Sequence, residues 1–198
     1  SDLRRQRQMC IRDRYLQQQK TDLIKVVLFG PESTGKTSLA IQLAKHFKTV
    51  YVKEFAREFL QNKLAKQNKI CEVHDLIPIA IGQMKSENEL TKKANDVLFC
   101  DTDLLTTATY SRLYFDNFCD PMIDEYSKKN KYDLYLLLDV DVPWVHDDLR
   151  DRPNDRKLFF ENFKQALIKH HKPFKLISGN YGERLKKSIN FVNEIIVK

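Results

Sequence analysis

Eight consecutive residues near the start of the chain have the types and the spacing that a phosphate-binding loop requires. The run from Gly30 to Thr37, GPESTGKT, fits the pattern GxxxxGK[ST] completely. Its glycines let consecutive backbone N–H groups turn toward one anion, its lysine can reach the β and γ phosphates of a nucleoside triphosphate, and its threonine hydroxyl can bind Mg²⁺. The pattern therefore predicts a site for ATP and Mg²⁺, formed by Gly30, Glu32, Ser33, Thr34, Gly35, Lys36, Thr37 and Ser38.

The residues on either side of this loop have the pattern that the motif needs. An apolar run at residues 24–29 precedes it, and Leu39, Leu43 and Phe47 follow at helical spacing. A strand that enters the loop and a helix that leaves it would place the positive end of the helix dipole beside the bound phosphates. A glycine-rich turn that matches by chance is the alternative, and it does not account for the flanking pattern.

Two carboxylates end a second apolar run, DVLFCDTD at residues 96–103. An acid at the tip of a strand can reach the Mg²⁺ shell or a substrate hydroxyl, so Asp101 and Asp103 are candidate catalytic residues. We expect Asp101 and Thr37 to hold the metal, and Asp103 to contact the substrate. A strand-to-helix turn with Thr102 or Asp103 as its N-cap is the alternative, and both interpretations can hold at once.

Glu54 and Arg57 follow another predicted strand, residues 49–52. Polar groups just past the C-terminal ends of parallel strands face the crevice in which ligands bind. We therefore expect both side chains to contact the second substrate, and Glu54 is a further candidate to orient its hydroxyl. An exposed ion pair at i, i+3 spacing is the alternative.

Residues 141–156 are too polar for a core and contain Arg150, Arg152 and Arg156. Guanidinium groups on such a segment could close over phosphates and neutralise charge during phosphoryl transfer. We expect an arginine-rich lid, with Arg150 and Arg152 catalytic and Arg156 bound to the nucleotide; the alternative is a surface loop whose arginines and aspartates pair. Trp144, the only tryptophan, could stack on an aromatic or pyridinium ring, although most tryptophans are packing residues.

The rest of the chain supplies elements that can position these residues. The run at residues 132–139 is nearly all apolar, as a strand covered on both faces must be. The periodicity predicts helices at residues 72–94, despite Pro78, around residues 158–167, and from residue 183 to 197, and a last strand at 174–177. Together they predict an α/β fold of the P-loop NTPase or kinase type, with a mainly parallel five-stranded sheet flanked by helices. The loop after the last strand commonly borders the adenine in such kinases, so Tyr181 is a candidate nucleotide contact.

Composition limits the class of protein. A chain of 198 residues with 42% hydrophobic content can form one sizeable core, and we assign residues 21–198 to a single kinase-like domain. No run approaches the roughly 20 apolar residues of a transmembrane helix, and no apolar segment follows the basic start. The four cysteines form no CxxC pair, which indicates free thiols. These features predict a cytoplasmic protein without a membrane anchor.

The net charge of +7 invites a nucleic-acid hypothesis, but residues 1–20 carry six Lys and Arg against two Asp. The body of the chain is therefore only weakly basic, and nucleic-acid binding is not indicated. Residues 1–20 lack apolar periodicity, so we expect a disordered basic tail outside the fold. Its RQRQMCIRDR run also resembles translated sequencing-adaptor DNA, and a basic arm for nucleic acid is the competing interpretation.

Several blocks together resemble the ribosylnicotinamide kinase domain of the bacterial NadR type: GPESTGKTSLA, EFAREF, IAIGQ, FCDTDLLTT, YDLYLLLDVDVPWVHDDLRD and GNYGERL. The resemblance covers roughly residues 23–186, and the DTDLLTT and LLLDxDVPWxxDxLRD blocks are far more specific than the loop alone. It implies ATP-dependent phosphorylation of the 5′-hydroxyl of nicotinamide riboside, with Trp144 stacked on the nicotinamide. The chain lacks an HxGH nucleotidylyltransferase motif and a helix-turn-helix region, so the kinase module alone is expected.

Two rival functions stay open at this point. One is a kinase for another nucleoside or nucleotide, and the other is a regulatory ATPase that binds ATP without a small acceptor. The CDTD strand tip and the arginines of the lid weigh against the second. The base of the acceptor and the oligomeric state, a homo-oligomer included, stay open as well.

Overall fold

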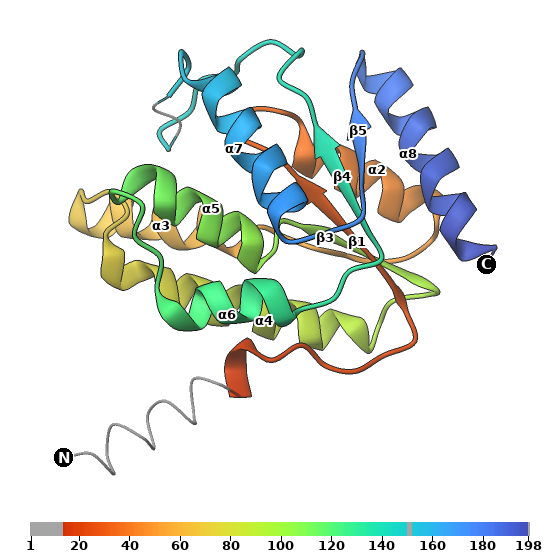
Figure 1. The fold of residues 1–198 in the computed structure, drawn as a ribbon, viewed down its shortest axis with the longest axis horizontal. Helices are drawn as coiled ribbons and strands as arrows, with labels where there is room; N and C mark the ends of the chain where they lie inside the picture. The colour runs from red at the N-terminus through yellow and green to blue at the C-terminus, as the bar shows by residue number, and fades with distance from the viewer. Residues whose placement is uncertain (1–13, 150–151, 198) are drawn as a thin grey trace.

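The computed structural model describes residues 14–149 and 152–197, and its centre is a sheet of five parallel strands (Figure 1). The strand order is β2-β3-β1-β4-β5, so the strand that enters the phosphate loop lies in the middle. Because all pairs of strands are parallel, their C-terminal ends meet at one edge of the sheet, where ligands bind in such folds. The strands are β1 (Ile24–Phe29), β2 (Tyr51–Val52), β3 (Val97–Asp101), β4 (Leu134–Leu138) and β5 (Phe174–Ile177).

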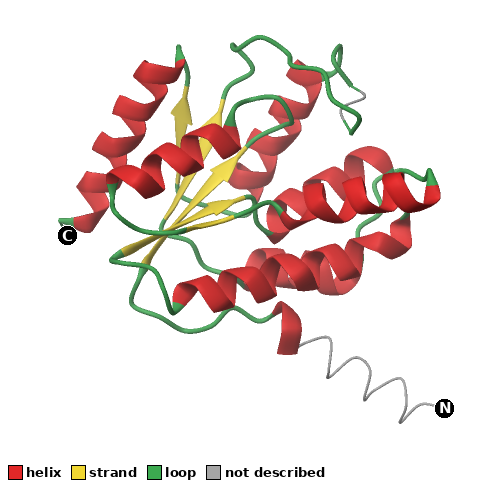
Figure 2. Ribbon diagram, turned by 180° about the vertical axis from the view of Figure 1, so that it is seen from behind, coloured by secondary structure: helices red, strands yellow, loops and turns green. Residues whose placement is uncertain are grey.

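Helices lie on both sides of the fanned strands (Figure 2). Side chains alternate between the faces of β1: Val26 and Leu28 pack with α2 and α8, whereas Val27 and Phe29 pack with α5 and α7. This alternation produces two cores, one on each face of the sheet. The helices are α2 (Lys36–His46), α3 (Phe55–Gln67), α4 (Leu76–Thr91), α5 (Leu104–Tyr114), α6 (Pro121–Lys129), α7 (Arg156–Lys169) and α8 (Tyr181–Ile196), with the 3₁₀ turn η1 (Val73–Asp75) before α4.

The five-stranded parallel α/β fold predicted from the sequence is confirmed. Pro78 does not interrupt the helix expected at residues 72–94, because it lies in the first turn of α4, where its missing N–H has no partner to lose. We did not predict α6, although Asp120 followed by Pro121 is typical of a helix start. In the part of the chain that the structure describes, no helix is both long and apolar enough to cross a bilayer.

Residues 14–20, the described part of the segment that we expected to lie outside the fold, pack against the domain. Leu16 is completely buried in a third core between α4, α5 and α6. The backbone N–H of Gln19 donates to Asn88 on α4, and Asn88 donates in return to the carbonyl of Gln17. One apolar side chain and a few hydrogen bonds therefore dock a segment that has no periodicity. Residues 1–13 lie outside the described residues.

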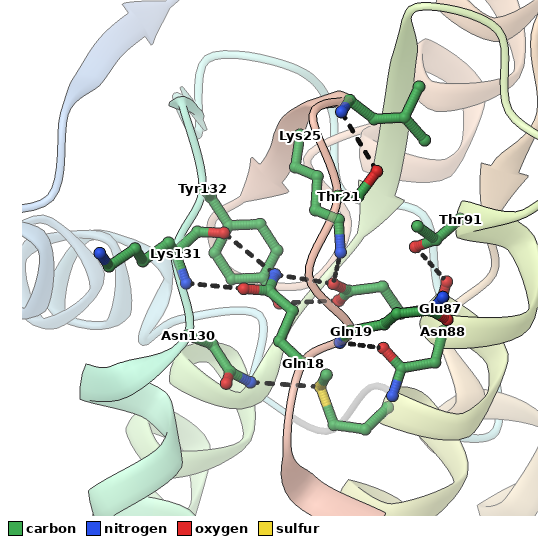
Figure 3. A network of polar contacts seen from close by, with 12 residues as sticks. Gln18, Gln19, Thr21, Lys25, Glu87, Asn88, Thr91, Asn130, Lys131 and Tyr132 are labelled. Atoms are coloured by element: carbon green, nitrogen blue, oxygen red, sulfur yellow. Dashed lines mark hydrogen bonds and ion pairs between the residues drawn. The ribbon is translucent and has the colours of Figure 1, made fainter.

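A buried ion pair joins α4 to β1, and the segment before β1 contacts it through Gln18 (Figure 3). Glu87 of α4 is fully buried and accepts a hydrogen bond from Lys25 Nζ at 2.8 Å, with the lysine only 3% exposed. It also accepts from the Tyr132 hydroxyl at 2.7 Å and from Gln18 Nε2 at 2.8 Å. Because three donors surround the carboxylate, the charge of Glu87 is satisfied despite its burial.

Candidate active site

The loop from Gly30 to Gly35 connects β1 to α2 and has the backbone conformation that its glycines allow. Gly30 has φ of 138°, and a Cβ there would lie 2.9 Å from the carbonyl oxygen of Leu138 on β4. Gly35, the N-cap of α2, has φ of 84° in the left-handed region. Both positions therefore need glycine, which lets the loop turn sharply into the helix.

Lys36 folds back into this loop. Its Nζ donates hydrogen bonds to the carbonyl oxygens of Gly30 at 2.9 Å and Pro31 at 2.7 Å. The hydroxyl of Thr34 also donates to Pro31, at 2.8 Å. The ammonium group is thus placed at the centre of the loop, beside the N-terminus of α2, where an anion would bind.

Thr37 and Asp101, which we predicted to hold the metal, lie in direct contact. The Thr37 hydroxyl donates to Asp101 Oδ2 at 2.5 Å, which joins the start of α2 to the end of β3. Asp101 is fully buried, and its Oδ1 has no hydrogen-bond partner among the described residues. An unpaired, buried carboxylate oxygen beside a hydroxyl suits Mg²⁺, which takes few protein ligands and keeps several waters.

Burial and the neighbouring Glu54 raise the pKa of Asp101 to about 6. The Asp101 carboxyl therefore binds a proton more tightly in the folded state than in the unfolded state. Below the pKa of Asp101 in the unfolded protein, this difference stabilises the folded state. That stabilisation is lost as the pH rises through 6.

Asp101→Asn is expected to raise the free energy of unfolding above pH 6 by about 2 to 3 kcal/mol and to change it little near pH 4, because asparagine carries no charge at either pH. Denaturant unfolding in EDTA at pH 4 and pH 8 measures this difference. Asp22→Asn, at an exposed aspartate, serves as the control. Equal stability of Asp101→Asn and wild type at pH 8 would contradict the raised pKa.

Asp103 is held by structural partners, and the substrate contact that we expected from it stays a prediction. It is buried and caps α5, with Oδ1 accepting from the backbone N–H of Thr106 at 2.9 Å and Oδ2 accepting from the Tyr135 hydroxyl at 2.7 Å. It is not among the described residues that line the cavity of the site. The N-cap alternative is the one that the structure bears out, since both carboxylate oxygens already have structural partners.

The cavity has a volume of about 510 Å³ and joins the phosphate loop to a pocket between α3, α4 and α5. Residues 32–38 form its phosphate side, and Glu54 and Arg57 also line the cavity, close enough to Asp101 to affect its pKa. Arg57 pairs with Asp147 rather than with Glu54, and the hydrogen bond to Asp147 raises the pKa of Arg57. The pocket side is mainly apolar and aromatic, with Leu60, Leu76, Ile79, Tyr110, Tyr114 and Phe115.

The expected lid residues lie at different places. Arg152 lines the cavity with its guanidinium 5.5 Å from the centre of the Tyr114 ring. Arg156 begins α7 and donates to the carbonyl oxygens of Val142 at 2.8 Å and Ser33 at 3.2 Å, so it holds the phosphate loop through its backbone. Arg150 lies outside the described residues, and an arginine-rich lid stays a prediction.

Trp144 and Tyr181 both lie near the phosphate loop. The described residues that line the cavity do not include Trp144, whose ring lies 5.7 Å from the guanidinium carbon of Arg156. This structure therefore does not bring Trp144 together with Glu54 and the α5 aromatics. Tyr181 begins α8, and a Cβ on Gly35 would lie 3.2 Å from its ring, so Tyr181 lies beside the loop. Its contact with the nucleotide stays a prediction.

Arg184 is a residue that we missed, although it lies in the GNYGERL block. It is 2% exposed and donates to three carbonyl oxygens, those of Thr34 at 2.7 Å, Gly179 at 2.8 Å and Asp139 at 3.0 Å. It also pairs with Asp141. One guanidinium group therefore connects the phosphate loop to the loops that follow β4 and β5.

A phosphate loop between a central parallel strand and a helix, with a buried acid on the neighbouring strand, defines a P-loop nucleotide-binding protein. The family model described as "AAA domain" matches residues 25–184. The chain belongs to this AAA-domain family.

The chain is also similar to known proteins of NAD metabolism and to nucleotide kinases. It is 30% identical over 177 residues to the trifunctional NAD biosynthesis/regulator protein NadR of Salmonella typhimurium. This alignment covers 86% of this chain and 42% of that NadR protein. A crystal structure of NadR in complex with NR superposes with a TM-score of 0.76 at 22% identity, over 87% of this chain and 51% of that one. Thymidylate kinase from Ehrlichia chaffeensis gives a TM-score of 0.61 at 15% identity, over 87% and 99%. The chain thus spans about half the length of the NadR proteins that it matches.

Proposed function

We propose that this chain is an ATP-dependent kinase that phosphorylates the 5′-hydroxyl of nicotinamide riboside. The observation that carries the proposal is the continuous cavity, in which a phosphate loop opens directly into an apolar and aromatic pocket of a size suited to a nucleoside. The similarity to NadR proteins supports nicotinamide riboside as the acceptor, because one NadR crystal structure is a complex with NR.

In the proposed reaction the 5′-oxygen attacks the γ-phosphorus of ATP, the bond from that phosphorus to ADP breaks, and the hydroxyl proton leaves to a carboxylate. Glu54 is our candidate for this carboxylate, because it lines the cavity near Asp101, whereas both carboxylate oxygens of Asp103 accept hydrogen bonds from Thr106 and Tyr135. Lys36 neutralises charge on the β and γ phosphates, and Arg152 can do so from the rim. Mg²⁺, held by Thr37 and Asp101, would neutralise charge on the triphosphate.

The direct test is the product formed from nicotinamide riboside and Mg-ATP, identified by mass spectrometry. We expect ADP and the riboside with one added phosphoryl group. A panel of other nucleosides is assayed for ADP release alongside it. Faster turnover with another nucleoside would identify a kinase of different specificity, and ATP hydrolysis that no acceptor changes would favour a regulatory ATPase.

The base of the acceptor should contact the aromatic wall formed by α5. Tyr114→Ala is expected to raise the KM for nicotinamide riboside by about tenfold, because one stacking contact is lost, and to leave the KM for Mg-ATP nearly unchanged. Trp144→Ala is the matched variant of a ring outside the cavity, and we expect a smaller effect from it. A larger effect of Trp144→Ala on the riboside KM alone would restore the stacking role that the sequence suggested for Trp144.

A further inference from the structure

Two neighbouring residues of α4, Gly82 and Gln83, hold the first residue of α3. Gln83 is 2% exposed, and its Oε1 accepts a hydrogen bond from the backbone N–H of Phe55 at 2.8 Å. A Cβ on Gly82 would lie 2.2 Å from Cε1 of Phe55, so the glycine leaves the room that the ring occupies. The backbone and the side chain of Phe55 are thus both positioned by the same turn of α4.

This arrangement leaves the Glu54 carboxylate available for the cavity. Glu54 is the N-cap of α3, and an N-cap side chain ordinarily accepts a hydrogen bond from the first turn of its own helix. Among the described residues, Glu54 makes no such capping bond. Gln83 instead satisfies one of the free N–H groups at the start of α3, and Glu54 lines the cavity.

Gln83 also contacts the turn that follows β3. Its Nε2 donates to the carbonyl oxygen of Thr102 at 3.5 Å. Thr102 has φ of 76°, in the left-handed region that a β-branched residue adopts only when its surroundings hold it there. Because Thr102 directly follows Asp101, the Gln83 amide links the start of α3, beside Glu54, to the end of β3, beside Asp101.

We propose that Gln83 is a positioning residue, which fixes the Glu54 carboxylate relative to Asp101 and the phosphate loop for phosphoryl transfer. The inference rests on the proposed kinase function, in which Glu54 orients the acceptor hydroxyl. The competing explanation is that Gln83 is a buried polar residue that only stabilises the fold.

Gln83→Met keeps the length of the side chain and removes both hydrogen bonds. We expect kcat to fall by about tenfold to a hundredfold, as small misplacements of reacting groups do, while the KM for Mg-ATP stays close to wild type. Exchange of the Phe55 amide proton, followed by NMR, should become faster in this variant. Gly82→Ala leaves Gln83 intact but places a methyl group where the Phe55 ring lies. We expect it to displace the ring and to lower kcat by a similar factor.

Met84→Ala is the control for a general loss of stability in α4. Met84 is the next residue of this helix, is fully buried, and packs in the core that contains Leu16 rather than at the cavity. We expect it to lower the melting temperature and to leave kcat unchanged below that temperature. A fall in kcat for Met84→Ala as large as that for Gln83→Met would overturn the positioning role, and so would wild-type kcat in folded Gln83→Met.

The two proposals fail in different ways. If the wild-type protein phosphorylates a nucleoside other than nicotinamide riboside, the proposed acceptor is wrong. The variants of Gln83, Gly82 and Met84 are then compared with the nucleoside that the protein does phosphorylate. Normal kcat in Gln83→Met with an active wild-type protein overturns the role of Gln83 alone. If the wild-type protein transfers phosphate to no acceptor, both proposals are overturned.

Discussion

Replacing Lys36 with alanine is expected to remove most of the kinase activity and to leave the protein folded. The Lys36 ammonium is held inside the phosphate loop by the carbonyl oxygens of Gly30 and Pro31, at the position where the β and γ phosphates would bind. Loss of one such charge contact raises the barrier to phosphoryl transfer by about 3 kcal/mol or more, which is a fall of a hundredfold or more in kcat/KM. Steady-state kinetics with Mg-ATP and the acceptor measure this loss.

Lys45→Ala provides the matched control, since Lys45 is an exposed lysine at the other end of α2. It should keep wild-type kinetics. Both variants should melt close to wild type, because Lys36 borders an open cavity and fills no core. A folded Lys36→Ala protein with near wild-type turnover would show that the phosphate loop is not the site of transfer.

The largest loss of stability is expected from Glu87→Ala. This change leaves the Lys25 ammonium buried without its partner, and it removes the acceptor for Tyr132 and one of two acceptors for Gln18. Breaking a buried ion pair in this way lowers the free energy of unfolding by about 3 to 5 kcal/mol. For a chain of this size the melting temperature should fall by roughly 6 to 20 °C, which calorimetry can measure.

Two further variants separate the ion pair from other effects of Glu87→Ala. Glu89→Ala removes an exposed glutamate from the same helix and should leave the melting temperature unchanged. Replacing Lys25 with methionine together with Glu87 by leucine should recover most of the lost stability, because apolar pairs often replace buried ion pairs without loss. A double variant as unstable as Glu87→Ala would show that the hydrogen bonds to Glu87, rather than the unpaired charge, dominate.

Much of the fold could be predicted because its signals are local. The alternation of strands with helices, the apolar runs and the phosphate motif each lie within a short window, and each predicted strand is present. The phosphate loop and the Thr37–Asp101 pair were predictable for the same reason: the loop motif fixes one partner, and an acid at a strand tip is the other.

The remaining errors come from contacts between distant parts of the chain. Asp101 and Asp103 are equivalent in sequence, and the hydrogen bond that Asp103 accepts from Tyr135 comes from the distant strand β4. Leu16 has no periodic neighbours, so its burial depends on α4, α5 and α6 being assembled around it. In the sequence, Arg184 has the features of an ordinary charged residue on a helix. Its four partners lie on three loops that are distant in the sequence and come together only in the folded protein.

The contacts of Arg184 affect the entropic cost of binding a nucleotide at this site. Because one buried guanidinium connects three loops, the nucleotide side of the cavity loses little conformational freedom when a nucleotide binds. On the acceptor side, the start of α3 is joined to the segment after β4 through the partly exposed pair of Arg57 and Asp147. Ordering of that partly exposed pair should therefore add an entropic cost to binding of the acceptor.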